Sequence, residues 1–134
     1  MTKLERAREI FQNDRYATQA TGIVIEEVDK NYARVSLKIE DRHLNANNLL
    51  MGGVPMVMSD FCFAVASNFE NTPTVTLSCT TSFMAGLKGD TLFAEARCLK
   101  DGRSTCFYEV SITDDLGTDI AKVSITGHKM LPKA

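Results

Sequence analysis

The sequence has no excess of positive charge and no long apolar run. Its 134 residues carry 15 Lys and Arg against 17 Asp and Glu, a formal net charge of −2. A nucleic-acid-binding protein is disfavoured, because no basic excess is present to neutralise phosphates. No stretch approaches the roughly 20 apolar residues that a membrane span requires. We therefore expect neither nucleic acid nor membrane as a partner.

Metal and disulfide patterns are also missing. The two histidines, His43 and His128, lie far apart, and none of the four cysteines forms a Cys-x-x-Cys pair. A metal site is therefore not expected. The start of the chain is charged and has no apolar secretory segment. We expect a cytoplasmic protein whose thiols are reduced and mostly serve as small buried hydrophobes. The cysteines are Cys62, Cys79, Cys98 and Cys106.

The composition is that of a folded domain. Hydrophobic residues make up 44% and charged residues 24% of the chain. This apolar content offsets the entropy that ordering costs, and the length suits one hydrophobic core. We expect residues 1–134 to form a single domain. The sequence has neither a Gly-x-Ser-x-Gly nucleophile motif nor a phosphate-binding loop.

Apolar residues change their spacing along the chain. Thr2 and Glu5 fit a capping box, and apolar residues then recur at helical spacing as far as Phe11, which predicts a helix that stops near Asn13. Elsewhere apolar and polar residues alternate, which predicts half-buried strands. Short turns between several of them favour antiparallel pairing. The predicted strands are residues 23–28, 33–39, 75–83, 92–98, 106–112 and 121–125.

One segment breaks the alternation. After Gly52-Gly53-Val54-Pro55, apolar residues up to Ser67 cover nearly the whole circumference of a helix. A helix that is apolar all round is buried, and Pro55 suits its first turn. The predicted fold is α+β, with a curved antiparallel sheet wrapped around this central helix and a short amino-terminal helix.

Asp60 is the outstanding residue of the central helix. It is the only Asp, Glu, Lys or Arg between His43 and Phe69. A carboxylate on an apolar helix is costly to bury without a partner. Asp60 is either a structural residue that bonds a loop or strand, or a general base or nucleophile in a water-poor cleft.

Two neighbouring features also carry possible chemistry. Gly52-Gly53 at a helix start leaves N–H groups free, and with the helix dipole these make a site for a developing oxyanion. The alternative is a tight entry into the helix. Residues 43–48 (HLNANN) are dense in hydrogen-bonding side chains, although such a run is more often a polar loop.

These motifs together resemble a known family. Residues 43–54 (HLNANNLLMGGV), followed by Met58-Ser59-Asp60, are similar to the hotdog-fold thioesterases of the PaaI (phenylacetic-acid-degradation) type. The family pattern is roughly H-x-N-x-x-G-x-x-H-G-G, then an apolar stretch that ends in an acidic residue. The resemblance covers nearly the whole chain and implies a sheet wrapped around a central helix. Further similar segments are residues 14–17, 32–35, 76–83, 88–90, 102–103 and 109–110.

The resemblance implies hydrolysis of acyl-CoA thioesters without a metal or organic cofactor, coenzyme A being part of the substrate. Asp60 matches the catalytic carboxylate, and Gly53 matches the glycine whose N–H polarises the thioester carbonyl. Asn45 matches a polar residue near the reacting group, and Thr76 a residue that holds the attacking water. The site is expected to span a homodimer interface, and two dimers often form a tetramer.

Further residues are expected to bind the substrate. His43, Met51 and Gly52 belong to the motif. Ile10 and Phe11 are candidates for lining an acyl pocket. Three cations near strand ends are candidates for the coenzyme phosphates, although each is also explained as a solvated surface charge. They are Lys88, Lys100 and Arg103.

The motif has two departures from the family. Met51 stands where a His is common, and Asn48 stands where a Gly is common. Met cannot donate a hydrogen bond, so any role of that His in positioning the carbonyl is lost. Three readings stay open: an acyl-CoA thioesterase, an acyl-CoA or lipid-binding protein with little turnover, and a hydratase or dehydratase on the same fold.

Overall fold

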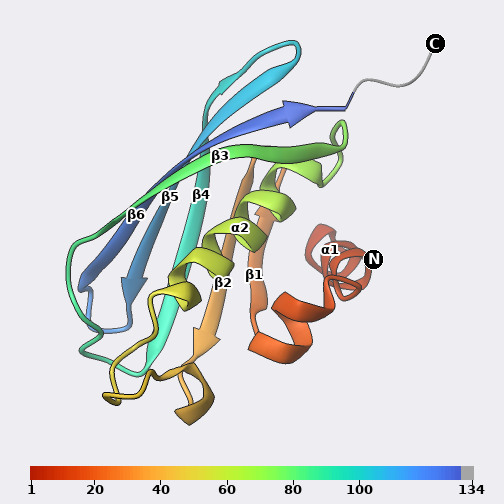
Figure 1. Ribbon diagram of the computed structural model, residues 1–134. Coiled ribbons are helices and arrows are strands. Elements are labelled where there is room, and N and C mark those ends of the chain that lie inside the picture. Colours follow the sequence, from red (N-terminus) through yellow and green to blue (C-terminus); the bar gives the residue numbers. More distant parts are fainter. Residues whose placement is uncertain (131–134) are drawn as a thin grey trace.

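The computed structural model describes residues 1–130, and its elements follow the predicted order (Figure 1). Within these residues no helix is long and apolar enough to cross a membrane. The elements are α1 (Lys3–Phe11), the π-helical turn η1 (Tyr16–Thr21), β1 (Val24–Asp29), β2 (Tyr32–Lys38), the 3₁₀ turn η2 (Asp41–His43), α2 (Gly53–Asn68), β3 (Thr74–Phe83), β4 (Thr91–Asp101), β5 (Thr105–Asp114) and β6 (Asp119–Lys129).

The strands form a single sheet in the order β1-β2-β4-β5-β6-β3, and every neighbouring pair is antiparallel. Figure 1 shows this sheet curving around α2. The α+β prediction of a curved sheet around a central helix is confirmed. The chain enters α2 after β2, and β3 then lies at the far edge beside β6, so α2 crosses the concave side of the sheet.

Helix α2 is buried where it faces the sheet. Met58 and Cys62 have no exposed surface, and the Cys62 thiol contacts the backbone oxygens of Ala33 and Ala94 at 3.4 Å. Ser59 and Ser67 donate hydrogen bonds to helix carbonyls one turn earlier, at 2.7 Å, which satisfies hydroxyls in an apolar core. Burial of each large apolar side chain stabilises the fold by about 1.5–3 kcal/mol.

Strand β3 is more exposed than its alternating sequence predicts. Val75, Leu77 and Phe83 are 45%, 59% and 56% exposed. The reason is its place in the sheet, because an edge strand has a neighbour on one side only. Cys79 is exposed for the same reason, whereas Cys62 and Cys106 are buried and Cys98 is half-buried. Cys79 is therefore an exception to the prediction that the thiols are mostly buried.

The amino-terminal segment packs beside β1. The capping box of Thr2 and Glu5 is present, and α1 ends at Phe11. The Arg8 guanidinium donates two hydrogen bonds to the Ile25 carbonyl, at 2.9 and 2.7 Å, which ties α1 to the sheet. The turn η1 was not predicted. It ends at Gly22, whose φ of 95° lies in the left-handed region that glycine adopts readily.

Candidate active site

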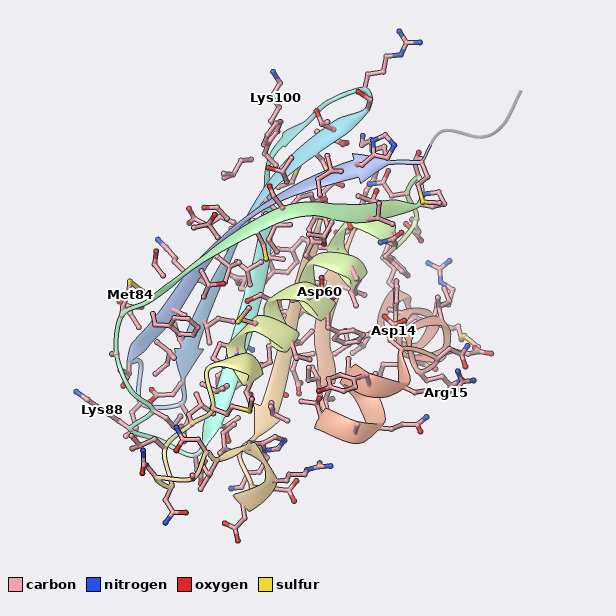
Figure 2. The ribbon with its side chains drawn as sticks, in the orientation of Figure 1. Asp14, Arg15, Asp60, Met84, Lys88 and Lys100 are labelled. Atoms are coloured by element: carbon pink, nitrogen blue, oxygen red, sulfur yellow. The ribbon has the colours of Figure 1, made fainter. Side chains whose placement is uncertain are left out.

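A groove of about 520 Å³ lies between α2, η1 and β3. Figure 2 shows Asp60 on α2, with Asp14 and Arg15 on the segment beside it. Much of the lining is apolar, and the polar groups come from three different elements. The lining residues are Asp14, Arg15, Tyr16, Ala17, Met56, Val57, Asp60, Phe61 and Cys79.

Asp60 lies near the middle of α2 and points into this groove. The hydroxyl of Thr76 on β3 donates a hydrogen bond to Asp60 Oδ1 at 3.3 Å. Two of the predicted catalytic residues are thus brought together from separate elements. The Asp60 side chain is exposed in the single chain, contrary to the predicted water-poor cleft. The sheet covers the opposite side of α2, so this side faces the open groove.

Gly53 begins α2, and Gly52 before it provides no side-chain cap. Gly53 lines a second hollow of about 200 Å³ together with His43 and Met51. Tyr16 and Val57 line both hollows, which makes them adjacent. Asp60 lies seven positions after Gly53. At a rise of about 1.5 Å per residue this places their backbones roughly 10 Å apart along the helix.

Asn45 lies away from Asp60. Its side-chain oxygen accepts hydrogen bonds from the N–H groups of Asn47 and Leu49, at 2.9 and 3.1 Å, and so closes a polar loop. Asn45 borders a third hollow of about 310 Å³ with Asn48, Gly52 and other residues. Asn48 has a φ of 59°. Gly and Asn both tolerate this left-handed conformation, which explains how Asn replaces the family's Gly.

His43 is buried, and both of its ring nitrogens are engaged. Nδ1 accepts a hydrogen bond from the Glu40 N–H at 2.9 Å, so the ring proton is assigned to Nε2. Nε2 then donates to the Thr21 carbonyl at 2.8 Å. His43 therefore joins η2 to the end of η1, and neither nitrogen is left to contact a substrate.

The remaining predicted residues lie on the surface. Met51 is 54% exposed and lies beside Gly53. Lys88, Lys100 and Arg103 are exposed. Lys88 precedes β4 and Lys100 lies near its end, and Figure 2 shows them at opposite ends of the sheet. At about 3.3 Å per residue β4 spans roughly 35 Å, so Lys88 and Lys100 of one chain do not converge on one phosphate.

The amino-terminal segment contributes residues that sequence reasoning missed. Asp14 and Tyr16 line the groove, whereas Ile10 and Phe11 do not. Ile10 points to solvent, and Phe11 packs edge-on against Phe61, with ring centroids 6.5 Å apart. Burial raises the pKa of the Asp14 carboxyl, and the charge of Asp60 raises it further. Their signal in the sequence is the similarity of residues 14–17 to the family, which indicates the fold but not a place in the groove.

Sequence comparison identifies the family. Residues 47–121, more than half of the chain, match the sequence profile of the Thioesterase superfamily. The chain belongs to the thioesterase superfamily. It is 29% identical over 127 residues to acyl-coenzyme A thioesterase PaaI of Escherichia coli K12, covering 94% of the chain and 90% of that protein.

Solved structures agree with this membership of the thioesterase superfamily. The E. coli PaaI protein from the phenylacetic acid degradation operon superposes with a TM-score of 0.88 at 25% identity, covering 98% of this chain and 96% of that one. A Streptococcus mutans protein bound to acetyl-CoA gives 0.77 at 26% identity, covering 84% and 91%. The predicted resemblance is confirmed: the chain is a hotdog-fold thioester hydrolase of the PaaI type.

Proposed function

We propose that the protein hydrolyses acyl-CoA thioesters with Asp60 as general base and the Gly53 N–H as oxyanion donor. The observation that carries this proposal is the Asp60 carboxylate in a largely apolar groove, bonded at 3.3 Å by Thr76. The relative named as an acyl-coenzyme A thioesterase and the relative bound to acetyl-CoA support the substrate class. No metal or organic cofactor takes part, and coenzyme A is part of the substrate.

The proposed reaction has two steps. A water molecule attacks the thioester carbon and gives one proton to Asp60, and the carbonyl oxygen becomes an oxyanion held by the Gly53 N–H. The carbon–sulfur bond then breaks, and the coenzyme A thiolate leaves and takes up the proton. The Thr76 hydroxyl orients Asp60 and the water. A single turnover in heavy-oxygen water distinguishes this route from one in which Asp60 is the nucleophile. Direct attack by water puts the heavy oxygen into the acid product in the first turnover. Hydrolysis of an acyl-Asp60 anhydride at the aspartyl carbonyl puts it into Asp60 first.

The separation of Gly53 from Asp60 supports a site shared by two subunits. Backbones about 10 Å apart along one helix do not both reach a single carbonyl group. We propose a homodimer in which each site takes Asp60 from one chain and Gly53 from the other, and a tetramer formed by two dimers. The exposed edge strand β3, with Val75 and Leu77 uncovered, suits pairing with a second copy.

Mixed dimers test the shared site. Asp60→Asn removes the base, and Gly53→Pro removes the N–H while keeping a residue that suits the first helical position. Co-expression of the two inactive variants is expected to restore about a quarter of the wild-type activity, because half of a random mixture is hybrid and each hybrid has one intact site. No recovery, or a stable active monomer in sedimentation, would contradict the shared site.

The activity itself is tested on a panel of acyl-CoA esters. Asp60→Asn is expected to lower kcat by about 10²–10⁴-fold with an unchanged circular dichroism spectrum. Glu9→Gln removes the same charge from an exposed position on α1 and serves as the control. Full activity of Asp60→Asn would show that the mechanism is wrong.

One observation favours a second candidate function. The Met51 side chain has no hydrogen-bond donor to offer at the Gly53 end of the site. This favours a protein that binds acyl-CoA or another lipid with little or no turnover. Tight binding of acyl-CoA without hydrolysis of any ester would support this alternative. An enoyl-CoA hydratase reading needs a His in the site, and the engaged nitrogens of His43 do not favour it.

A further inference from the structure

Two carboxylates face one groove. Asp60 comes from α2 and Asp14 from the turn between α1 and η1, and both line the same hollow. Figure 2 shows Asp14 on the segment that lies beside α2. The charge of Asp60 contributes to the raised pKa of Asp14, after burial, which indicates that the two groups interact across the groove.

No cation neutralises this pair within residues 1–130. Neither carboxylate belongs to an ion pair there. The other titratable groups that line the groove are Arg15, Tyr16 and Cys79. One cation therefore stands against two carboxylates, and the remaining wall is apolar. An acyl chain suits this wall, but a further negative charge is repelled there.

We propose that Asp14 is a specificity-determining residue, which together with Asp60 makes the groove accept neutral acyl groups and reject those that end in a carboxylate. This inference rests on the proposed function, because it takes the groove as the acyl site. Asp60 supplies one charge as part of the reaction. Asp14 supplies a second negative charge that the reaction does not require. This charge repels acyl groups that end in a carboxylate.

Hexanoyl-CoA and glutaryl-CoA test the proposal, because their acyl chains are similar in length and differ in the terminal charge. Wild-type kcat/KM is expected to favour hexanoyl-CoA. Asp14→Asn keeps the shape and removes the charge, so it should raise the relative kcat/KM for glutaryl-CoA by about five- to tenfold. Added salt should shrink the wild-type discrimination. Asp14→Glu restores the charge and should restore the wild-type ratio.

Glu9→Gln is the matched control. It changes the net charge equally but lies outside the groove, so the substrate ratio should stay at the wild-type value. An unchanged ratio in Asp14→Asn overturns the proposal, and so does a wild-type preference for glutaryl-CoA. If no ester is hydrolysed, the proposed function fails. In that case the Kd values of the two esters, measured for wild type and Asp14→Asn, test the charge selection separately. The wild type should bind hexanoyl-CoA more tightly, and Asp14→Asn should improve the relative affinity for glutaryl-CoA by the same factor of about five to ten.

Discussion

The Thr76 hydroxyl on β3 donates a hydrogen bond to Asp60 Oδ1 on α2, at 3.3 Å. The two residues are sixteen positions apart in the sequence, and the crossing of the central helix over the sheet brings them together. This bond leaves the second carboxylate oxygen of Asp60 to face the groove. In the proposed reaction, that oxygen accepts the proton of the attacking water.

Removal of the Thr76 hydroxyl should slow the reaction moderately. Thr76→Val keeps the shape of the side chain and removes the donor, so kcat is expected to fall by about three- to tenfold, the worth of one exposed hydrogen bond. KM should change little. Thr76→Ser keeps the hydroxyl and should retain most of the activity. Equal loss in both variants would mean that packing of β3, and not the hydroxyl, matters.

A donor at position 51 should raise the rate. Met51 lies beside Gly53, where the oxyanion is proposed to form, and it cannot donate a hydrogen bond. Met51→His is expected to raise kcat on the best acyl-CoA ester by about tenfold. Met51→Leu adds no donor and is the control. The idea fails if the two variants have the same kcat.

The fold follows largely from apolar periodicity. The alternating strands and the all-apolar helix predicted the sheet around α2, since these patterns depend on burial within one chain. The exposure of β3 was not predictable in this way. Val75 and Leu77 have the sequence of a half-buried strand, and their exposure comes from the place of β3 at the sheet edge.

The site was predictable only in part. Asp60 stood out because a lone charge in an apolar helix is conspicuous, and Thr76 was named from the family resemblance. Asp14 lies in an unremarkable charged stretch, and only the packing of η1 beside α2 brings it to the groove. The engagement of both His43 nitrogens depends on backbone groups of Glu40 and Thr21, which the motif itself does not specify.

Low pH should reduce the stability that Asp114 gives to the segment before β4 and to the turn between β5 and β6. Asp114 accepts hydrogen bonds from the N–H groups of Lys88, Gly89, Leu116 and Thr118, at 2.8–3.0 Å. Burial alone would raise the pKa of this carboxyl, but the backbone bonds outweigh burial and lower it. The stabilisation is therefore complete above the unfolded pKa of about 3.9 and declines as the pH falls below it.

Asp114→Asn tests this contribution. An amide keeps one accepting oxygen but presents an NH₂ group to two of the backbone donors, so Tm should fall clearly at pH 7. The difference from wild type should narrow below about pH 4, where the carboxyl of the unfolded wild-type chain takes up a proton that the folded chain does not yet bind. Asp119→Asn, exposed at the start of β6, is the control. A difference in Tm that is the same at both pH values would contradict the electrostatic explanation.

Asp14 should destabilise the fold at neutral pH. Its pKa is raised by burial and by Asp60, so the cost to stability grows as the pH rises above the unfolded pKa of about 3.9 and is complete above the folded pKa, and there is no cost where both states are protonated. Asp14→Asn is expected to raise Tm at pH 7 by about 1–3 °C and to leave Tm unchanged near pH 3. Asp60→Asn should lower the pKa of Asp14, followed by carboxyl NMR, although burial keeps it above its usual value. A stabilisation that persists at low pH would instead indicate that the Asn side chain packs better than Asp.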